Sequence, residues 1–191
     1  MKPKGVEPTM KQIKHFWRLL DEGMITSANL QMYLENLDQL MPSFPTVMDN
    51  TTGLTVLIRK AVKADKTGDL NIDSDIAAER FEFDYGVRRV TLGIARFQEG
   101  ESGRDCAKRI EPEGFVLENI CELAAFLDTY PTQVAKYDEV VALGEKSRWM
   151  SKKNGCLVPY AAVDRKGVRS FFLTRFDDLY SSDVGVLVSR P

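Results

Sequence analysis

Histidine is almost missing from this chain of 191 residues, and cysteine is scarce. His15 is the only histidine, and the three cysteines (Cys106, Cys121 and Cys156) stand far apart with no C-x-x-C pair. A zinc site or a nucleophile–histidine pair would have to be assembled from these few, distant residues. We therefore expect no catalytic residue, metal site or cofactor of these kinds, and we expect reduced thiols instead of a disulfide framework.

Long apolar runs and a strong charge of one sign are also missing. No apolar stretch approaches the roughly 18 residues that a membrane-spanning helix needs. The opening MKPKGVEP lacks the apolar core of a signal peptide, so we expect a cytoplasmic protein without membrane contact. The formal net charge of -2 gives no overall attraction to nucleic acid. Hydrophobic residues at 43% and charged residues at 28% are typical of a soluble globular protein.

The common nucleotide-binding loops are absent, since neither G-x-x-x-x-G-K-[ST] nor G-x-G-x-x-G occurs. Two acidic stretches are present, at residues 65–75 and 177–183. In the first, polar residues alternate as in an EF-hand loop, but Leu70 stands where the loop needs glycine and Ile76 where it needs glutamate. The same alternation fits a strand or extended loop with one wet face, in which Leu70 and Ile72 point inward. We therefore predict no metal site, and calcium binding by either stretch is left as an alternative.

Residues 9–38 predict two amphipathic helices joined by a tight turn. Gly23 stands where the end of the first helix favours glycine. Apolar residues recur at helical spacing in both halves: Ile13, Phe16, Trp17 and Leu20, then Leu30, Tyr33, Leu34 and Leu37. Pro42 and Pro45 end the second helix. Such a pair can read DNA, dock a partner or pack against its own chain.

The distribution of charge disfavours DNA reading by this pair. No lysine or arginine lies between Arg18 and Arg59, so the second helix has no cation for a phosphate. The first eighteen residues are basic, which leaves one alternative, a nucleic-acid-associated regulator that contacts phosphates through the first helix. We expect instead that the pair docks on the rest of the chain or on a second copy, as a homodimer through the N-terminal helices.

The remaining sequence mixes helical and strand patterns, which predicts an α+β fold. Helices are predicted at 54–62, 102–109 and 117–127, and strands at 87–97, 138–144, 156–163, 168–176 and 184–188. Because the strands follow one another without helical crossovers, the pairing should be mainly antiparallel. Residues 42–52 have the composition of a linker. We divide the chain into a helical hairpin (1–45), a linker with a helix (46–72) and an α+β domain (73–191).

Several phrases occur in order from residue 73: DSDIAAERF, VRRVTLGIARF, GFVLENICELAAFLDTYP, VVALG followed by a tryptophan, and VGVLVSR. Together they resemble a family of small uncharacterised bacterial proteins, and the resemblance carries no activity with it. Their order is also distantly similar to C-type-lectin-like and formylglycine-generating-enzyme-like domains. That similarity implies a scaffold that presents loops near its C-terminal strands. The disulfide cysteines, calcium–sugar triplets and active-site cysteines of those domains have no match here.

The loops implied by this resemblance are residues 145–155 and 175–183. Their candidate ligand-binding residues are Arg148, Trp149, Arg175, Phe176, Asp177, Asp178 and Tyr180. Aromatic and arginine side chains at loop tips are typical of binding hot spots, although the aromatics could instead complete a core. We predict a non-enzymatic binding or protein-interaction module of unknown ligand. The alternatives are the nucleic-acid-associated regulator and an enzyme with an unrecognised site.

Overall fold

The computed structural model describes residues 43–63, 70–82 and 86–190. The predicted helical pair at 9–38 and nearly all of the predicted unit 1–45 lie outside these residues, as does the part of the first acidic stretch at 65–69. None of the described helices is long and apolar enough to cross a membrane.

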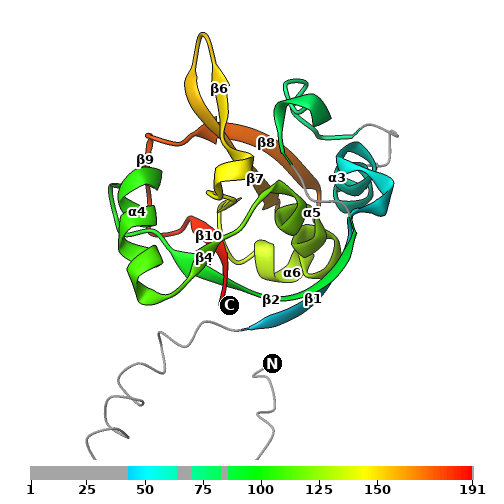
Figure 1. The fold of residues 1–191 in the computed structure, drawn as a ribbon, viewed down its shortest axis with the longest axis horizontal. Coiled ribbons are helices and arrows are strands. Elements are labelled where there is room, and N and C mark those ends of the chain that lie inside the picture. The colour runs from blue at the N-terminus through cyan, green and yellow to red at the C-terminus, as the bar shows by residue number, and fades with distance from the viewer. Residues whose placement is uncertain (1–42, 64–69, 83–85, 191) are drawn as a thin grey trace, which may run out of the picture. The chain divides into compact units, whose positions relative to one another are not determined.

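The described part of the chain has an α+β fold built on a mixed, mostly antiparallel sheet of eight strands (Figure 1). The strand order is β1-β2-β10-β5-β7-β6, with β4 beside β10 and β8 beside β7. Only the short β5–β10 pairing is parallel among the ladders between the sheet's described strands. The strands are β1 (Phe44–Asp49), β2 (Val87–Arg96), β4 (Val116–Leu117), β5 (Val140–Val141), β6 (Trp149–Ser151), β7 (Gly155–Val163), β8 (Arg169–Arg175) and β10 (Gly185–Ser189).

Helices cover the inner side of the curved sheet, and a separate small unit lies at one end. Helix α5 (Ile120–Thr129) packs against α3 (Leu54–Val62), and the short α6 (Pro131–Val134) follows α5. Helix α4 (Gly103–Ile110) lies beside a second sheet of two strands, β3 (Glu101–Ser102) and β9 (Leu179–Tyr180) (Figure 1). Single 3-10 turns connect these elements: η2 (Asn50–Thr52), η3 (Ala78–Arg80), η4 (Glu111–Glu113) and η5 (Glu145–Ser147).

The core lies between the sheet and helices α3 and α5. Phe126 and Leu127 of α5 meet Phe171 of β8 in it, and all three side chains are fully buried. Met48 of β1 and Ile58 of α3 belong to the same core. The segment 44–62 is therefore part of the packing of the α+β unit.

The prediction of a linker at 42–52 is wrong, because residues 44–49 form strand β1, which pairs antiparallel with β2. Its burial alternates: Thr46 and Met48 point inward, while Val47 and Asp49 are exposed. Pro45 hid this pattern in the sequence, since proline cannot donate to a sheet ladder and is confined to edges such as this one. The strand predicted at 138–144 is shorter than expected, at only two residues.

The other helix and strand predictions for the described residues are confirmed to within a few residues. Helix α4 begins as its sequence predicts, because the Asp105 N–H donates to the Ser102 side chain at 3.2 Å. A turn at Lys153-Asn154-Gly155 joins β6 to β7.

Strand β7 organises the sheet near the predicted loops. It pairs with β8 along one edge and with both β5 and β6 along the other. Pro159 lies in the middle of β7, and its C=O accepts a hydrogen bond from the Ala142 N–H at 3.0 Å. Since the nitrogen and oxygen of a strand residue point to the same edge, the proline nitrogen faces the place where β5 ends and the chain leaves the sheet.

Candidate functional site

The two loops predicted to carry the site, 145–155 and 175–183, lie side by side at one end of β7 and β8. Leu157 is paired with Arg175 in the ladder, and the Phe176 N–H donates to the Cys156 C=O at 2.9 Å. The β6–β7 hairpin projects beyond the sheet at this end (Figure 1). The structure therefore brings together the two segments that the sequence singled out.

Phe176 does not offer its ring to solvent. The ring is buried, with the Arg148 guanidinium 4.5 Å from its centroid and the Arg104 guanidinium 6.0 Å away. Arg148 is held in place because its Nε donates to the Leu143 C=O at 3.1 Å. Asp177 is exposed and pairs with Arg104 at 3.1 Å. This cluster fixes the loop 175–183 against α4.

Tyr180 and Trp149 also serve the packing. The Tyr180 ring is buried and stacks on Phe97 at 4.3 Å, and its hydroxyl donates to the Arg175 C=O at 2.6 Å. Burial raises the pKa of Tyr180 far above its ordinary value, so the phenol stays neutral. Trp149 is half-buried against the core, with the Arg80 guanidinium 4.2 Å from its ring. The three predicted aromatics thus have the packing role that was the alternative interpretation.

Two apolar side chains in the same loops are exposed in their place. Met150 is 70% exposed and Leu179 is 75% exposed, the two most exposed large apolar residues of the described chain. Alternation along β6 could have indicated Met150, since a strand that turns Trp149 inward turns its neighbour outward. The sequence offered no comparable signal for Leu179.

A polar cleft of about 310 Å³ lies between these loops and the turn at residues 73–75. We call it the β8 cleft, and it is lined by Asp73, Asp75, Asn154, Leu157, Leu173, Thr174, Arg175 and Asp178. Among the described residues, neither the Arg175 side chain nor the Asp178 carboxylate has an ion-pair partner. Both are exposed at the rim, where a ligand could meet them.

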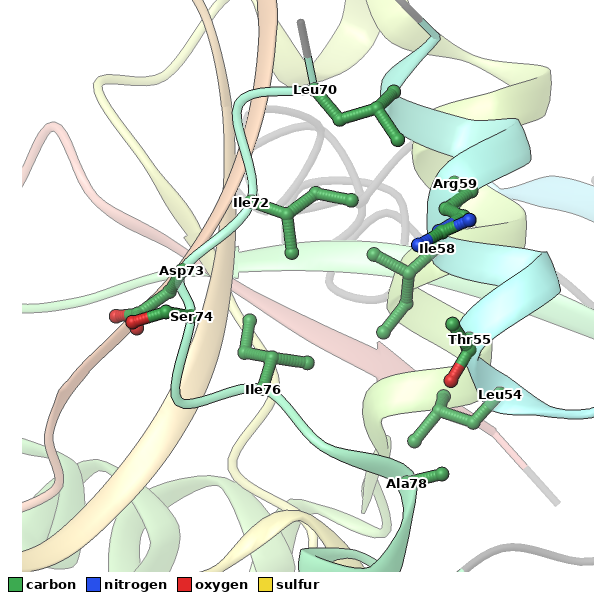
Figure 2. Close-up of a pocket in the computed structure, with 10 residues that line it drawn as sticks. All are labelled: Leu54, Thr55, Ile58, Arg59, Leu70, Ile72, Asp73, Ser74, Ile76 and Ala78. Carbon is green, nitrogen blue, oxygen red and sulfur yellow. The ribbon is translucent and has the colours of Figure 1, made fainter.

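The turn at 73–75 separates the β8 cleft from an apolar groove on α3. Figure 2 shows Ile72 and Ile76 pointing toward Ile58 of α3, whereas Asp73 and Ser74 point to the opposite side. The Asp73 carboxylate accepts the Asp75 N–H at 2.8 Å, which stabilises the turn. The segment therefore has one dry side and one wet side, and the wet side borders the cleft.

Carboxylates in this region do not gather as a metal site would require. No group of three or more histidine, cysteine, aspartate or glutamate side chains suited to hold a metal ion occurs within 43–63, 70–82 and 86–190. The Asp75 carboxylate is already paired with Arg80 at 2.8 Å. The polar groups that line the β8 cleft offer hydrogen bonding and charge pairing.

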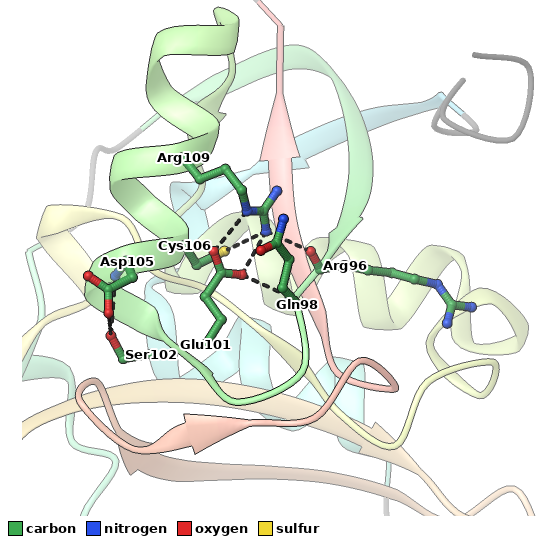
Figure 3. Close-up of polar contacts among 7 residues, drawn as sticks. All are labelled: Arg96, Gln98, Glu101, Ser102, Asp105, Cys106 and Arg109. Atoms are coloured by element: carbon green, nitrogen blue, oxygen red, sulfur yellow. Dashed lines mark hydrogen bonds and ion pairs between the residues drawn. The ribbon is translucent and has the colours of Figure 1, made fainter. Parts of the chain in front are cut away.

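The polar contacts around α4 have a structural character (Figure 3). Arg109 donates to both oxygens of Glu101, at 2.8 Å and 2.7 Å, and to the Arg96 C=O at 2.9 Å. Burial, with the Glu101 carboxylate nearby, raises the pKa of the Cys106 thiol to about 12. A thiol with so high a pKa is a poor nucleophile, so this cluster has the features of a support for α4 and not of a reaction centre.

Comparison with known proteins adds no assignment to this geometry. No protein-family model matches the chain, and neither the curated proteins nor the solved structures include a match.

Proposed function

We propose that this protein is a non-enzymatic binding or interaction module that engages its ligand with the end of the sheet where loops 145–155 and 175–183 meet. The observation that carries the proposal is the β8 cleft, to which both loops contribute. Its rim offers a guanidinium and a carboxylate, on Arg175 and Asp178, that are not paired within the described chain. Ligand sites combine a concave surface with a few such polar groups.

Exposed apolar residues in the same two loops supply a driving force for association. Met150 and Leu179 are largely in water, and burying each against a partner would contribute about 1.5–3 kcal/mol. Interfaces typically surround a small number of such anchors with polar groups. The arrangement suits recognition of a partner surface better than enclosure of a small substrate.

Binding is better supported than thiol catalysis. Burial is the main cause that raises the pKa of the Cys156 thiol, which lies near the loops, above its ordinary value. A catalytic cysteine needs the opposite shift, because the thiolate is the reactive form.

The broader features of this proposal rest on the sequence. They are a C-type-lectin-like arrangement of residues 73–191, a cytoplasmic location and a homodimer through the N-terminal helices. The loops near the C-terminal strands fit the first of these. The nucleic-acid-associated regulator remains the alternative, and it would act through Lys11, Lys14 and Arg18 of the first helix and not through the β8 cleft.

An unbiased selection tests the proposal. Ligands for the full chain would be selected from random peptide and small-fragment libraries, and each affinity remeasured on the double variant Met150→Ser with Leu179→Ser. Both side chains are exposed, so the fold should be unaffected. We expect at least a tenfold loss of affinity. Val56→Ser, an exposed valine on α3, is the matched control and should change nothing. Ligands that bind the double variant as well as the wild type would refute the proposal.

A further inference from the structure

Strand β8 has an open edge inside the β8 cleft. Among the described residues it pairs with β7 on one side only, apart from a single parallel bridge between Ile72 and Phe171 on the other. At that bridge, the Phe171 N–H donates to the Asn71 C=O at 3.0 Å, and the Phe171 C=O accepts from the Asp73 N–H at 2.9 Å. The segment 71–73 thus begins a further strand and then stops.

The turn at Asp73 takes the chain away from the sheet before the pairing can continue. The Ile76 N–H donates to the Asp73 C=O at 3.0 Å, which closes the turn. Because peptide groups alternate between the two edges of a strand, Leu173 and Arg175 point their N–H and C=O groups the same way as Phe171. These groups therefore face the cleft.

Only part of this edge is satisfied by the chain itself. The Arg175 C=O accepts from the Tyr180 hydroxyl at 2.6 Å and from the Asp178 N–H at 3.3 Å. The N–H and C=O of Leu173 and the N–H of Arg175 have no such partner among the described residues. An open edge that keeps unpaired donors and acceptors is a template for another strand.

Charge restricts what can occupy this edge. The Asp73 N–H bonds to the Phe171 C=O and the Asp178 N–H to the Arg175 C=O, so the two aspartates flank Leu173 along β8. Arg175 is the cation among the residues that line the cleft. Asp75 also lines the cleft, with its charge shared by Arg80. The surplus is negative, so a lysine or arginine side chain on the ligand would be complementary.

We propose, resting on the binding function above, that the β8 cleft takes an extended basic peptide segment that adds as a strand to the open edge at Leu173 and Arg175. Backbone hydrogen bonds would fix the ligand, and its cationic side chains would meet Asp73 and Asp178. The open stretch runs from Leu173 to Arg175, which are about 7 Å apart at roughly 3.3 Å per residue. The ligand is thus a short extended segment, held at its centre by the sheet edge.

The probe is a blocked pentapeptide of alternating lysine and valine, titrated into the full chain. Hydrogen exchange of the Leu173 and Arg175 amides, followed by NMR, should slow at saturation. The same peptide with its central amides N-methylated keeps its charge but loses its donors, and its affinity should fall at least tenfold. Asp178→Asn should weaken binding of the unmodified peptide about threefold or more. Asp138→Asn, an exposed carboxylate outside the cleft lining, is the matched control and should have no effect.

The outcomes separate this inference from the function on which it rests. Equal binding of the N-methylated peptide, protection of amides away from β8, or no binding at millimolar peptide would each overturn strand addition. Ligands from the unbiased selection that still depend on Met150 and Leu179 would leave the binding function standing in all three cases. If those ligands also ignore the loops, both proposals fail.

Discussion

Glu101 is a single carboxylate that joins three parts of the fold. It begins β3, it is paired with Arg109 of α4, and it accepts the Gln98 N–H at 2.9 Å (Figure 3). Burial alone would raise the pKa of this carboxyl, but the hydrogen bonds from Arg109 and Gln98 outweigh it, so the pKa lies below its ordinary value of 4.5. The ionised form is therefore the one that stabilises the fold.

This shift predicts the pH dependence of stability. Because the pKa of Glu101 is lower in the folded chain, its contribution to the free energy of unfolding is complete above the unfolded value of 4.5 and is lost as the pH falls through the folded value. Glu101→Gln should lower the free energy of unfolding by about 1.5–3 kcal/mol at neutral pH. It should also make this free energy depend less on pH in the acid range, as measured by urea unfolding at several pH values. Glu113→Gln, exposed on η4, is the control. A pH dependence as steep as that of the wild type would contradict this role.

Glu122 carries a second prediction at the scale of the residue. Its side chain is 2% exposed, forms an ion pair with Arg88, and accepts the Asn119 N–H at 3.2 Å at the start of α5. Glu122→Ala should lower the free energy of unfolding by about 2–3 kcal/mol, because it removes both contacts and leaves the N–H unsatisfied. Glu122→Gln keeps an acceptor and should cost less in the same denaturant titration. Equal losses in the two variants would show that the cap contact contributes nothing.

Single residues were the hardest part of the site to predict from the sequence. Phe176 and Tyr180 stand in a polar loop, which suggested exposure, yet both rings turn inward. Their direction depends on Arg148 and Phe97, which lie far away in the chain. Arg175 and Asp178 were predicted as ligand-binding residues of the loop, and only the folded arrangement shows that they line a cleft.

At the scale of elements, the contact between α4 and the loop 175–183 is unusually close. The Gly103 N–H donates to the Phe176 C=O at 3.0 Å, and a side-chain carbon at Gly103 would lie 2.5 Å from the same oxygen. Only glycine permits this approach, so the first residue of α4 sets the position of the loop.

Gly103→Ala should therefore destabilise the protein by about 1–3 kcal/mol, because the added methyl group pushes the loop from α4. Thermal unfolding measures the loss, and the change in the loop should also reduce the affinity of any ligand of the β8 cleft. Lys108→Ala, on the exposed side of the same helix, should stay within about 0.5 kcal/mol of the wild type. Unchanged stability in Gly103→Ala would mean that the loop adjusts freely.

Long elements were predictable, and short ones were not. The strands β2, β7 and β8 each carry seven or more residues, enough to stand out as strand-like runs in the sequence. Strand β5 has only two residues, and the apolar residues that follow it are buried in the core without being paired as a strand. The apolar run in the sequence therefore predicted a longer strand than the one that forms.

At the scale of the whole molecule, β1 and α3 are joined to the later strands in one core. Met48 of β1 is fully buried in this core, so Met48→Ala should lower the free energy of unfolding by about 2–5 kcal/mol. Since the packing is shared, the unfolding transitions followed by circular dichroism and by tryptophan fluorescence should shift to lower temperature together. Val47→Ala changes an exposed residue of the same strand and should have little effect. Two separate transitions in Met48→Ala would contradict a single cooperative unit.

The β8 cleft is a property of the whole fold, and for that reason the sequence could not predict it. Its walls come from the turn at 73–75, the β6–β7 hairpin and the end of β8. The alternation in the sequence indicated Leu70 and Ile72 as inward-facing, and both line the apolar groove on α3. Which strand that segment meets depends on a bridge between Ile72 and Phe171, ninety-nine residues apart, and local patterns carry no information about it.

Pro159 has a consequence for how the sheet avoids misfolding. With the observed alignment, its nitrogen points to the side where β5 has ended and away from β8. A shift of β7 by one residue would turn that nitrogen toward β8, where an N–H donor is needed. The same shift would move the β7 side chains that pack beside Phe171 from the core to the opposite face of the sheet. The proline therefore penalises the nearest wrong alignment. It acts as a register lock for the strand beside the open edge, so that Leu173 and Arg175 always present the same groups to the cleft.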